Sequence, residues 1–573
     1  MAFSLVAAAA CSREVHKDAT PLIAPDAVAS AVREAAREDP AAGLELSPAE
    51  QIDHVLGRVS YGPRPGDRER LARIGIAAFL EEQLHPERID DARVEAEMKR
   101  FAVLSRSTGD LTQQLVQAKE RRKATAAGEA MDEPPPPPDS GAQMPDPDVT
   151  VPAPKAGGDL RKQLGKAGRG PGFEIVSQLA EAKLVRAVDS ERQLREVMAD
   201  FWFNHFNVFA GKMNEAALLP AYERTIREHA LGNFGELLRA VAHSPAMLIY
   251  LDNWRSALPR PAERRGRLGR LRPAPASGQR RGINENYARE LLELHTLGVD
   301  GGYTQEDVVA VARCFTGWTV KEPQRDPKFA FEPRMHDFGP KRVLGKEIAE
   351  GQGEDDGEQV LDLLVHHPST ARFVASKLAR RFVSDDPPDM LVDRAARTFA
   401  QTGGDIRAVL RTILESPEFW SRRALRAKVR SPLELVAGSV RALDARVDDP
   451  MALLRAVARI GEPLFAAQPP TGYLDTAQNW LSSGALLARI DFGLALASGQ
   501  LDGVRVDLSA VSRDARGPEE VLDRASGRIG APPLSEKTRA YILAELREAP
   551  VQSPAVAARA VGLLFGAPEL QRR

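Results

Sequence analysis

The spacing of apolar residues is the feature that most restricts what this chain can fold into. From Phe173 to the end, apolar residues recur every three or four positions, which places them along one face of a helix. The clearest cases are EIVSQLAEAKLVRAV (174–188), ERQLREVMADFWFNHF (191–206) and PLELVAGSVRAL (432–443). Strand-like alternation is nearly confined to Lys328–Pro333 and Lys341–Leu344, which we expect to pair as one hairpin around His336 and Asp337. The sequence therefore predicts a mainly α fold, a multi-helix array with one short β hairpin.

Helix signals also precede this region. Ser47 stands where an N-cap is expected, with Pro48 in the first turn and Glu50 placed to complete a capping box. Three further helices are expected at Asp67–Ile74, Ile76–Leu84 and Asp90–Thr125.

Two segments interrupt the helical pattern. Residues 126–171 contain the five consecutive prolines Pro134–Pro138 and several glycines, a composition that cannot continue a helix and predicts an exposed, disordered insert. Residues 255–281 hold nine arginines among prolines and glycines, and form either a solvated loop or a patch for anionic lipid headgroups. We divide the chain into a signal (1–11), a tether (12–46), a helical domain (47–500) and a C-terminal helical segment (501–573).

The first residues indicate a membrane address. MAFSLVAAAA runs directly into Cys11, and a short apolar run ending in small residues before a cysteine is similar to a bacterial lipoprotein signal, although the usual basic start is missing. Lipidation of Cys11 would anchor the chain in the cell envelope, periplasm-facing or exported; the alternative is a frayed N-terminus without function. No run of about 20 apolar residues occurs, so no transmembrane helix is expected.

Composition excludes some classes of function. Of 573 residues, only two are cysteine, which is too few for a disulfide framework. The formal net charge of −2 argues against a general nucleic-acid-binding protein, which would be strongly basic. Phosphate-binding loops, dinucleotide fingerprints and nucleophile elbows are also missing.

The densest group of polar residues lies in a helix expected at Ile283–Leu297, which Gly298 should end. One side of this helix is apolar, and His295 projects from it, as core histidines commonly do. The opposite side carries Asn286, Arg289, Glu290 and Glu293, with Glu285 at its edge and Asn284 just before it. These residues form either a solvated face with ordinary i,i+4 ion pairs or the wall of a cleft in which Arg289 sets the charge state of the two acids. Asn284, Glu285, Asn286 and Arg289 are the candidate binding residues, and Glu290 and Glu293 are candidate catalytic acids.

A second helix should begin at Thr304. Asp307, three residues on, is expected to complete a capping box in place of the usual Glu or Gln. Cys314 falls among apolar positions of this helix and is expected to be a buried, inert thiol.

Two histidines outside these helices are further candidates. His205 shares a helix face with Met198 and Trp202, so burial should disfavour its charged form; it is either a base or metal ligand, or a core histidine whose nitrogen meets a backbone carbonyl. His336 and Asp337 fall in the predicted hairpin loop. His205, His336 and a carboxylate, Glu290 or Asp337, could make a two-histidine, one-carboxylate site for a divalent metal.

Long segments of the chain resemble one bacterial family. They include HVLGRVSYGPRPGD, FWFNHF, NFGELLRAVAHSPAMLIYLDN, NENYARELLELHTLG, ARCFTGWT, HDFGPKRVLG, ARFVASKLARRFV and KVRSPLELV. In this order, between about Ile52 and Arg489, they are similar to the domain of unknown function 1800 family. The resemblance implies a mostly helical, commonly exported envelope protein with a secreted companion similar to arylsulfatases. Tyr473 stands where the family leads us to expect tryptophan, and the two inserts look longer than usual.

These observations lead us to expect a cell-envelope accessory or binding scaffold that acts with an exported partner. The alternative is a metal-assisted hydrolase that uses His205, His336 and a carboxylate. The sequence leaves open whether the chain is an enzyme, and it does not specify a substrate or a metal.

Overall fold

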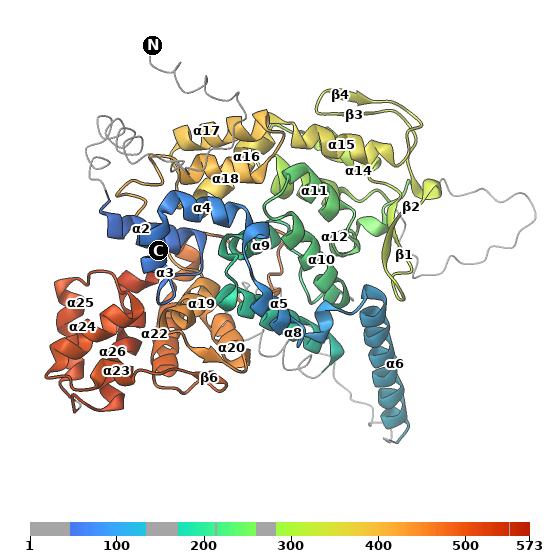
Figure 1. Ribbon diagram of the computed structural model, residues 1–573. Helices are drawn as coiled ribbons and strands as arrows, with labels where there is room; N and C mark the ends of the chain where they lie inside the picture. Colours follow the sequence, from blue (N-terminus) through green and yellow to red (C-terminus); the bar gives the residue numbers. More distant parts are fainter. Residues whose placement is uncertain (1–45, 133–169, 213–214, 259–281, 549) are drawn as a thin grey trace, which may run out of the picture.

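The computed structural model describes residues 46–132, 170–212, 215–258, 282–548 and 550–573. Within these ranges helices predominate and the strands form three two-stranded sheets, which confirms the mainly α prediction (Figure 1). The predictions about Cys11, the tether and most of both inserts lie outside the described residues. No described helix combines the length and apolar character needed to cross a membrane.

The N-terminal helices follow their local signals. In α2 (Pro48–Val59) the Ser47 side chain accepts from the Glu50 backbone N–H while the Glu50 carboxylate accepts from the Ser47 N–H, so the capping box is confirmed. Helices α3 (Asp67–Ile74) and α4 (Ile76–Leu84) have the predicted bounds. A short 3-10 turn, η1 (Pro86–Arg88), follows them.

The single long helix expected at Asp90–Thr125 is wrong. The segment forms α5 (Ala92–Met98), η2 (Ala102–Leu104) and α6 (Thr108–Asp132), and α6 projects from the rest of the fold (Figure 1). The break has two physical causes. Ser107 starts a new helix by accepting a hydrogen bond from the Asp110 N–H at 3.1 Å, and the turn before it buries Phe101 and Val103 in a small separate core.

The central layer is a run of helices. It comprises α8 (Pro171–Asp189), α9 (Gln193–His205), α10 (Glu215–His229), α11 (Phe234–Ala242), α12 (Pro245–Tyr250) and η3 (Asn253–Arg255). Then come α13 (Glu285–Glu290), a π-helical turn η4 (Leu291–Thr296) and α14 (Gln305–Cys314). Gly298 has φ 86°, as expected of a helix-ending glycine, and the Thr304–Asp307 capping box is formed. Cys314 is free and buried, and burial raises its pKa to about 12, which agrees with the inert-thiol prediction.

The predicted strand pairing is wrong, although both strands exist. Strand β2 (Lys328–Phe331) pairs with β1 (Trp318–Lys321), and β3 (Lys341–Val343) pairs with β4 (Lys346–Ile348), both antiparallel. Local turns decide this. Leu344 and Gly345 both have positive φ, as a tight two-residue hairpin turn requires, so β3 closes on its immediate neighbour. The 3-10 turn η5 (Pro333–Met335) separates the two hairpins.

The remaining helices complete the array. They are α15 (Asp355–Val365), α16 (Pro368–Phe382), α17 (Asp389–Gln401), α18 (Ile406–Leu414), α19 (Pro432–Leu443), α20 (Met451–Ile460), α21 (Ala477–Trp480), α22 (Ser483–Ala497), α23 (Ser509–Ser512), α24 (Pro518–Ile529), α25 (Glu536–Leu546), α26 (Pro554–Gly566) and η6 (Pro568–Gln571). Strands β5 (Arg446–Val447) and β6 (Val504–Arg505) form the third sheet.

The C-terminal helices share a core with the rest of the chain. One hydrophobic cluster extends from Leu46 to Leu570. Helices α22 and α26 approach so closely that a Cβ on Gly493 would lie 2.9 Å from the carbonyl oxygen of Gly562. The last residue, Arg573, lies beside α2, where a Cβ added to Gly57 would be 3.5 Å from the Arg573 side chain (Figure 1). The three regions that meet there, α2, α19 and the last helices, are distant in sequence.

Candidate functional site

A polar pocket with aromatic walls forms where α8, α9, α16, the start of α19 and the segment 462–480 converge. We call it the aromatic pocket. Its lining residues are Lys183, Asp200, Phe201, Phe203, Asn204, Asn207, Arg381, Ser431, Glu462, Leu464, Phe465, Ala467, Tyr473, Asp475 and Trp480. Four separate segments that read FWFNHF, ASKLARRF, RSPLELV and GYLDTAQNW therefore contribute to one site.

Two asparagines, Asn204 near the end of α9 and Asn207 just after the helix, fix the outer wall of the pocket. Asn204 donates to the Tyr473 carbonyl and accepts from the Tyr473 N–H, both at 2.7 Å, while Asn207 donates to the carbonyls of Ala467 and Pro469. Gly472 has φ 65°, and a Cβ there would lie 2.4 Å from the Asn204 carbonyl oxygen. Only glycine permits this approach, so the loop is held in one position against the helix.

Most charges at the pocket are neutralised in pairs. Lys183 lies 2.5 Å from Asp200, and Arg381 lies 2.5 Å from Glu434, which is buried behind the pocket. Asp475 is 3.0 Å from the buried ammonium group of Lys428. These carboxylates are therefore committed to cations of the protein itself.

Glu462 and Trp480 differ from the other polar lining residues. Glu462 accepts a hydrogen bond from the Leu433 N–H at 2.8 Å but has no ion-pair partner among the described residues. Burial, followed by the nearby Asp200, raises its pKa to about 8, which favours the protonated carboxyl at neutral pH. Trp480 is 6% exposed, and its indole N–H finds no acceptor in the described part of the chain. The pocket thus contains two hydrogen-bond donors on neutral side chains.

One residue of the wall is conformationally strained. Phe465 has φ 61°, a left-handed conformation that side-chain-bearing residues adopt at a cost of roughly 1 kcal/mol or more. Its ring packs edge-on against Phe203, with 4.9 Å between centroids, and its carbonyl accepts from the Ala210 N–H. The strain is therefore maintained by contacts on both sides of the residue.

His205 lies next to Asn204 on α9 but faces the core. Its Nε2 is 3.1 Å from the carbonyl oxygen of His295, and its Nδ1 is 2.9 Å from the Lys377 ammonium nitrogen. Nε2 is therefore the donor and Nδ1 the acceptor. Burial, then Lys377, holds the pKa of His205 well below its usual value, as predicted, and burial lowers the pKa of Lys377 to about 8. Of the two alternatives for His205, this contact matches the core histidine whose ring nitrogen meets a backbone carbonyl.

His336 belongs to a different buried group. Its Nδ1 is 2.7 Å from the Thr316 carbonyl oxygen, and its Nε2 is 3.0 Å from the Asp356 carboxylate, which also pairs with Lys341. Asp337, adjacent in sequence, pairs with Arg313 at 2.6 Å. All these groups have partners within the hairpin region and α14–α15.

The three proposed metal ligands are thus not brought together. Within the described ranges, no three His, Cys, Asp or Glu side chains are grouped as a metal ion would require. A ligating imidazole needs a free lone pair. The Nδ1 lone pair of His205 accepts from Lys377, and both nitrogens of His336 face oxygen acceptors.

Three of the candidate binding residues after Ile283, namely Glu285, Asn286 and Arg289, lie on the outer face of α13. Glu285 and Arg289 are 48% and 41% exposed and are 4.0 Å apart, with Gln305 of α14 bonded to both. Asn286 is exposed, whereas Asn284 caps the helix and donates to the Leu251 carbonyl. None of these residues lines the aromatic pocket.

The candidate acids Glu290, at the end of α13, and Glu293, in η4, are half-buried. Burial, then Glu293, raises the pKa of Glu290, and Arg289 opposes that shift. Glu293 accepts from the Tyr303 hydroxyl at 3.3 Å. Arg289 therefore does moderate the charge of Glu290, although the helix face around it is open to solvent.

The sequence profile of one family, described as "Protein of unknown function (DUF1800)", matches residues 54–572. This chain belongs to the DUF1800 family. The match confirms the resemblance seen in the sequence, and it also includes residues 501–572, which the sequence analysis placed in a separate segment. No curated protein and no solved structure shows a significant similarity to the chain.

Within this DUF1800 chain, sequence reasoning missed the residues that build the aromatic pocket. Asp200, Asn204, Glu462, Tyr473 and Trp480 were not among the candidates, because the pocket joins α9 to the segment 462–480, and no spacing rule connects segments so far apart in the chain. One signal was available: FWFNHF and GYLDTAQNW both combine aromatic rings with asparagine, a composition unusual for a plain core helix.

Proposed function

We propose that this chain is an accessory binding protein of the bacterial cell envelope, and that the aromatic pocket holds a small uncharged polar ligand such as a sugar ring. The observation that carries the proposal is the pair of neutral donors, the protonated Glu462 carboxyl and the unpartnered Trp480 N–H, in a pocket with five aromatic rings. Ligand pockets commonly combine apolar walls with a few fixed polar groups.

The charge pattern favours a neutral ligand. Because Asp200, Asp475 and Glu434 are paired with Lys183, Lys428 and Arg381, little uncompensated charge remains for an ionic ligand. A sugar ring can pack its apolar face on aromatic side chains such as Tyr473 and Trp480, whose centroids are 6.0 Å apart, while its oxygens accept from the two donors.

The same pattern supports binding over hydrolysis. Acid–base hydrolysis of a glycoside requires a protonated carboxyl and a second, ionised carboxylate available to water or substrate. Glu462 meets the first requirement, but the other carboxylates at the pocket are held by cations. The metal-assisted alternative has less support, because the lone pairs of His205 and His336 are directed to protein partners.

Isothermal titration calorimetry with neutral monosaccharides and N-acetylated amino sugars tests the proposal. At least one is expected to bind, and Trp480→Phe, which keeps a ring but removes the N–H, should weaken binding about tenfold, the equivalent of one lost hydrogen bond of roughly 1.4 kcal/mol. Trp254→Phe is the matched control, since its N–H is also unpartnered but lies away from the pocket. A panel without any binding, or equal affinity in Trp480→Phe, would contradict the proposal.

The envelope address is proposed from the AAAAC run before residue 12 and from the implied export of the family. An arylsulfatase-like exported companion is the partner that the resemblance implies. Fractionation of cells that express the native gene should place the wild-type protein in the membrane fraction with a mass increased by acyl chains, whereas Cys11→Ser should lack both properties. If both proteins were soluble and had the same mass, the proposed lipid anchor would be contradicted, whereas the proposed ligand binding in the aromatic pocket would not be affected.

A further inference from the structure

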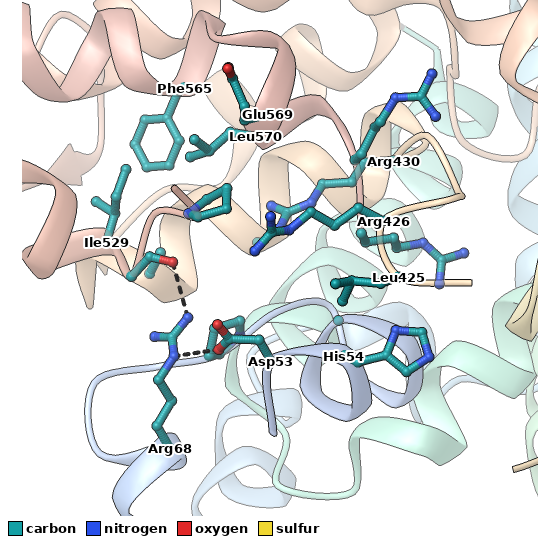
Figure 2. Close-up of a pocket in the computed structure, with 18 residues that line it drawn as sticks. Asp53, His54, Arg68, Leu425, Arg426, Arg430, Ile529, Phe565, Glu569 and Leu570 are labelled. Carbon is teal, nitrogen blue, oxygen red and sulfur yellow. Dashed lines mark hydrogen bonds and ion pairs between the residues drawn. The ribbon is translucent and has the colours of Figure 1, made fainter. Parts of the chain in front are cut away.

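A second cavity lies where α2, the segment 425–442 and the C-terminal helices meet, and it is distinct from the aromatic pocket. Figure 2 shows its labelled residues coming from these three regions, except Arg68 of α3, which bridges Asp53 and the Gly530 carbonyl. We call it the arginine pocket. Five arginines line it, Arg68, Arg426, Arg430, Arg572 and Arg573, against two side-chain carboxylates, Asp53 and Glu569.

The carboxylates leave most of this positive charge uncompensated. Asp53 pairs with Arg68 at 2.6 Å. Glu569 accepts from the Ser535 N–H at 2.9 Å and from the Thr538 hydroxyl at 3.0 Å, so its lone pairs are used by the neighbouring helix start. Outside the lining, Glu434 pairs with Arg573.

The remaining guanidinium groups lack anionic partners among the described residues. Arg572 donates only to the Ala427 carbonyl, at 3.3 Å. The side chains of Arg426 and Arg430 have no hydrogen bond or ion pair with any described residue, and one guanidinium nitrogen of Arg573, Nη1, is buried and unpartnered within the same ranges. Cations of this kind in a partly buried site require a counter-charge.

The backbone supports the same conclusion. Arg426 has φ 56°, in the left-handed region, where such strain is found preferentially at ligand sites. Burial lowers the pKa of Arg430, Glu434 opposes that shift, and the neighbouring Arg489, Arg68 and Arg426 add to it.

We infer that the arginine pocket binds a tetrahedral oxyanion of the phosphate class, free or as the end of a phosphate monoester. Guanidinium groups present paired N–H donors that match the oxygens of phosphate. Arg426 and Arg430 supply the uncommitted donors, and Arg68 and Arg573 provide positive charge on either side. The bound anion would link α2 and the 426–430 segment to the C-terminal helices.

Thermal unfolding and calorimetric titration of the full chain with sodium phosphate, at ionic strength held constant with sodium chloride, test this inference. A saturable rise in the melting temperature with phosphate but not with chloride is expected, since a ligand that binds only the folded state stabilises it. Arg430→Gln and the half-exposed Arg426→Gln should each weaken phosphate binding at least tenfold. Arg446→Gln, on β5 and 73% exposed, is the control that should bind as wild type does.

If Arg430→Gln fails to fold, Arg426→Gln still tests the inference, because it removes guanidinium donors from a less buried position. Glycerol 3-phosphate as a second titrant distinguishes an ester-borne phosphate from the free ion, and binding of either supports the site. Absence of a saturable phosphate effect beyond that of chloride would overturn the inference. So would unchanged phosphate affinity in Arg426→Gln.

Discussion

Glu434→Gln is expected to destabilise the protein by roughly 3–5 kcal/mol, because it removes the carboxylate from a buried ion cluster. Glu434 lies 2.5 Å from Arg381 and 3.0 Å from Arg573, and all three side chains are buried. Burial opposes the charge, but Arg381 and Arg573 lower the pKa of Glu434 to about 2. Glutamine preserves the capping box with Ser431, since Gln serves there as well as Glu, so the loss would report the missing charge.

Urea unfolding monitored by circular dichroism measures this effect. Glu519→Gln is the matched control, since its pair with Arg547 is largely exposed and should contribute less than about 1 kcal/mol. The folded pKa of Glu434 is depressed, so its contribution is fully present above the ordinary pKa of 4.5 and is lost as pH falls toward 2. Wild-type stability should therefore fall more steeply in acid than that of the variant. If Glu434→Gln and Glu519→Gln lowered the free energy of unfolding by equal amounts, the buried ion cluster would not stabilise the protein as predicted.

Glu462→Gln is expected to change how the free energy of unfolding depends on pH between about 4.5 and 8, above the acid range in which Glu434 acts. With its pKa raised to about 8 by burial, Glu462 is expected to keep its proton in the folded protein up to about that pH, whereas the unfolded chain releases it near 4.5. Between these values the folded state binds more protons, so the wild-type free energy of unfolding should decrease as pH rises. Each pKa unit corresponds to about 1.4 kcal/mol, and the whole difference therefore amounts to a few kcal/mol.

In Glu462→Gln this decrease should be absent, because glutamine stays neutral and can still accept from the Leu433 N–H. The variant should match the wild type below pH 4.5 and exceed it at pH 8. Chemical unfolding across this range provides the measurement, with the exposed Glu306→Gln as control. A variant whose pH slope equals that of the wild type would show that Glu462 is already ionised in the folded protein.

Local signals made much of the fold predictable. Caps at Ser47 and Thr304, the stop at Gly298 and the burial of Cys314 depend on residues within one or two turns, and all are confirmed. The strand pairing failed because it was set by the turn at Leu344–Gly345, which the alternation pattern does not encode.

The aromatic pocket was beyond sequence reasoning for a different reason. Asn204 meets Tyr473 across 269 positions, and Arg381 meets Glu434 across two helices, so no spacing rule connects them. Conversely, the many charged residues at Glu285–Arg289 led to the prediction of a binding site, yet these side chains are charged because they face solvent. Helical periodicity shows which face is apolar but not which distant segment covers it.

Because of the π-helical turn η4, the number of residues in this segment determines which way the residues after it face. Leu297 donates to the Leu292 carbonyl at 2.8 Å, and the Thr296 hydroxyl reaches the Leu291 carbonyl, both five residues back. Such a turn corresponds to an α-helix with one residue inserted. Removing a residue would restore the ordinary helix but rotate the downstream residues by about 100°, taking the His295 carbonyl away from His205. In the evolution of this chain, gain or loss of a residue here should therefore be tolerated less than exchange of one side chain for another.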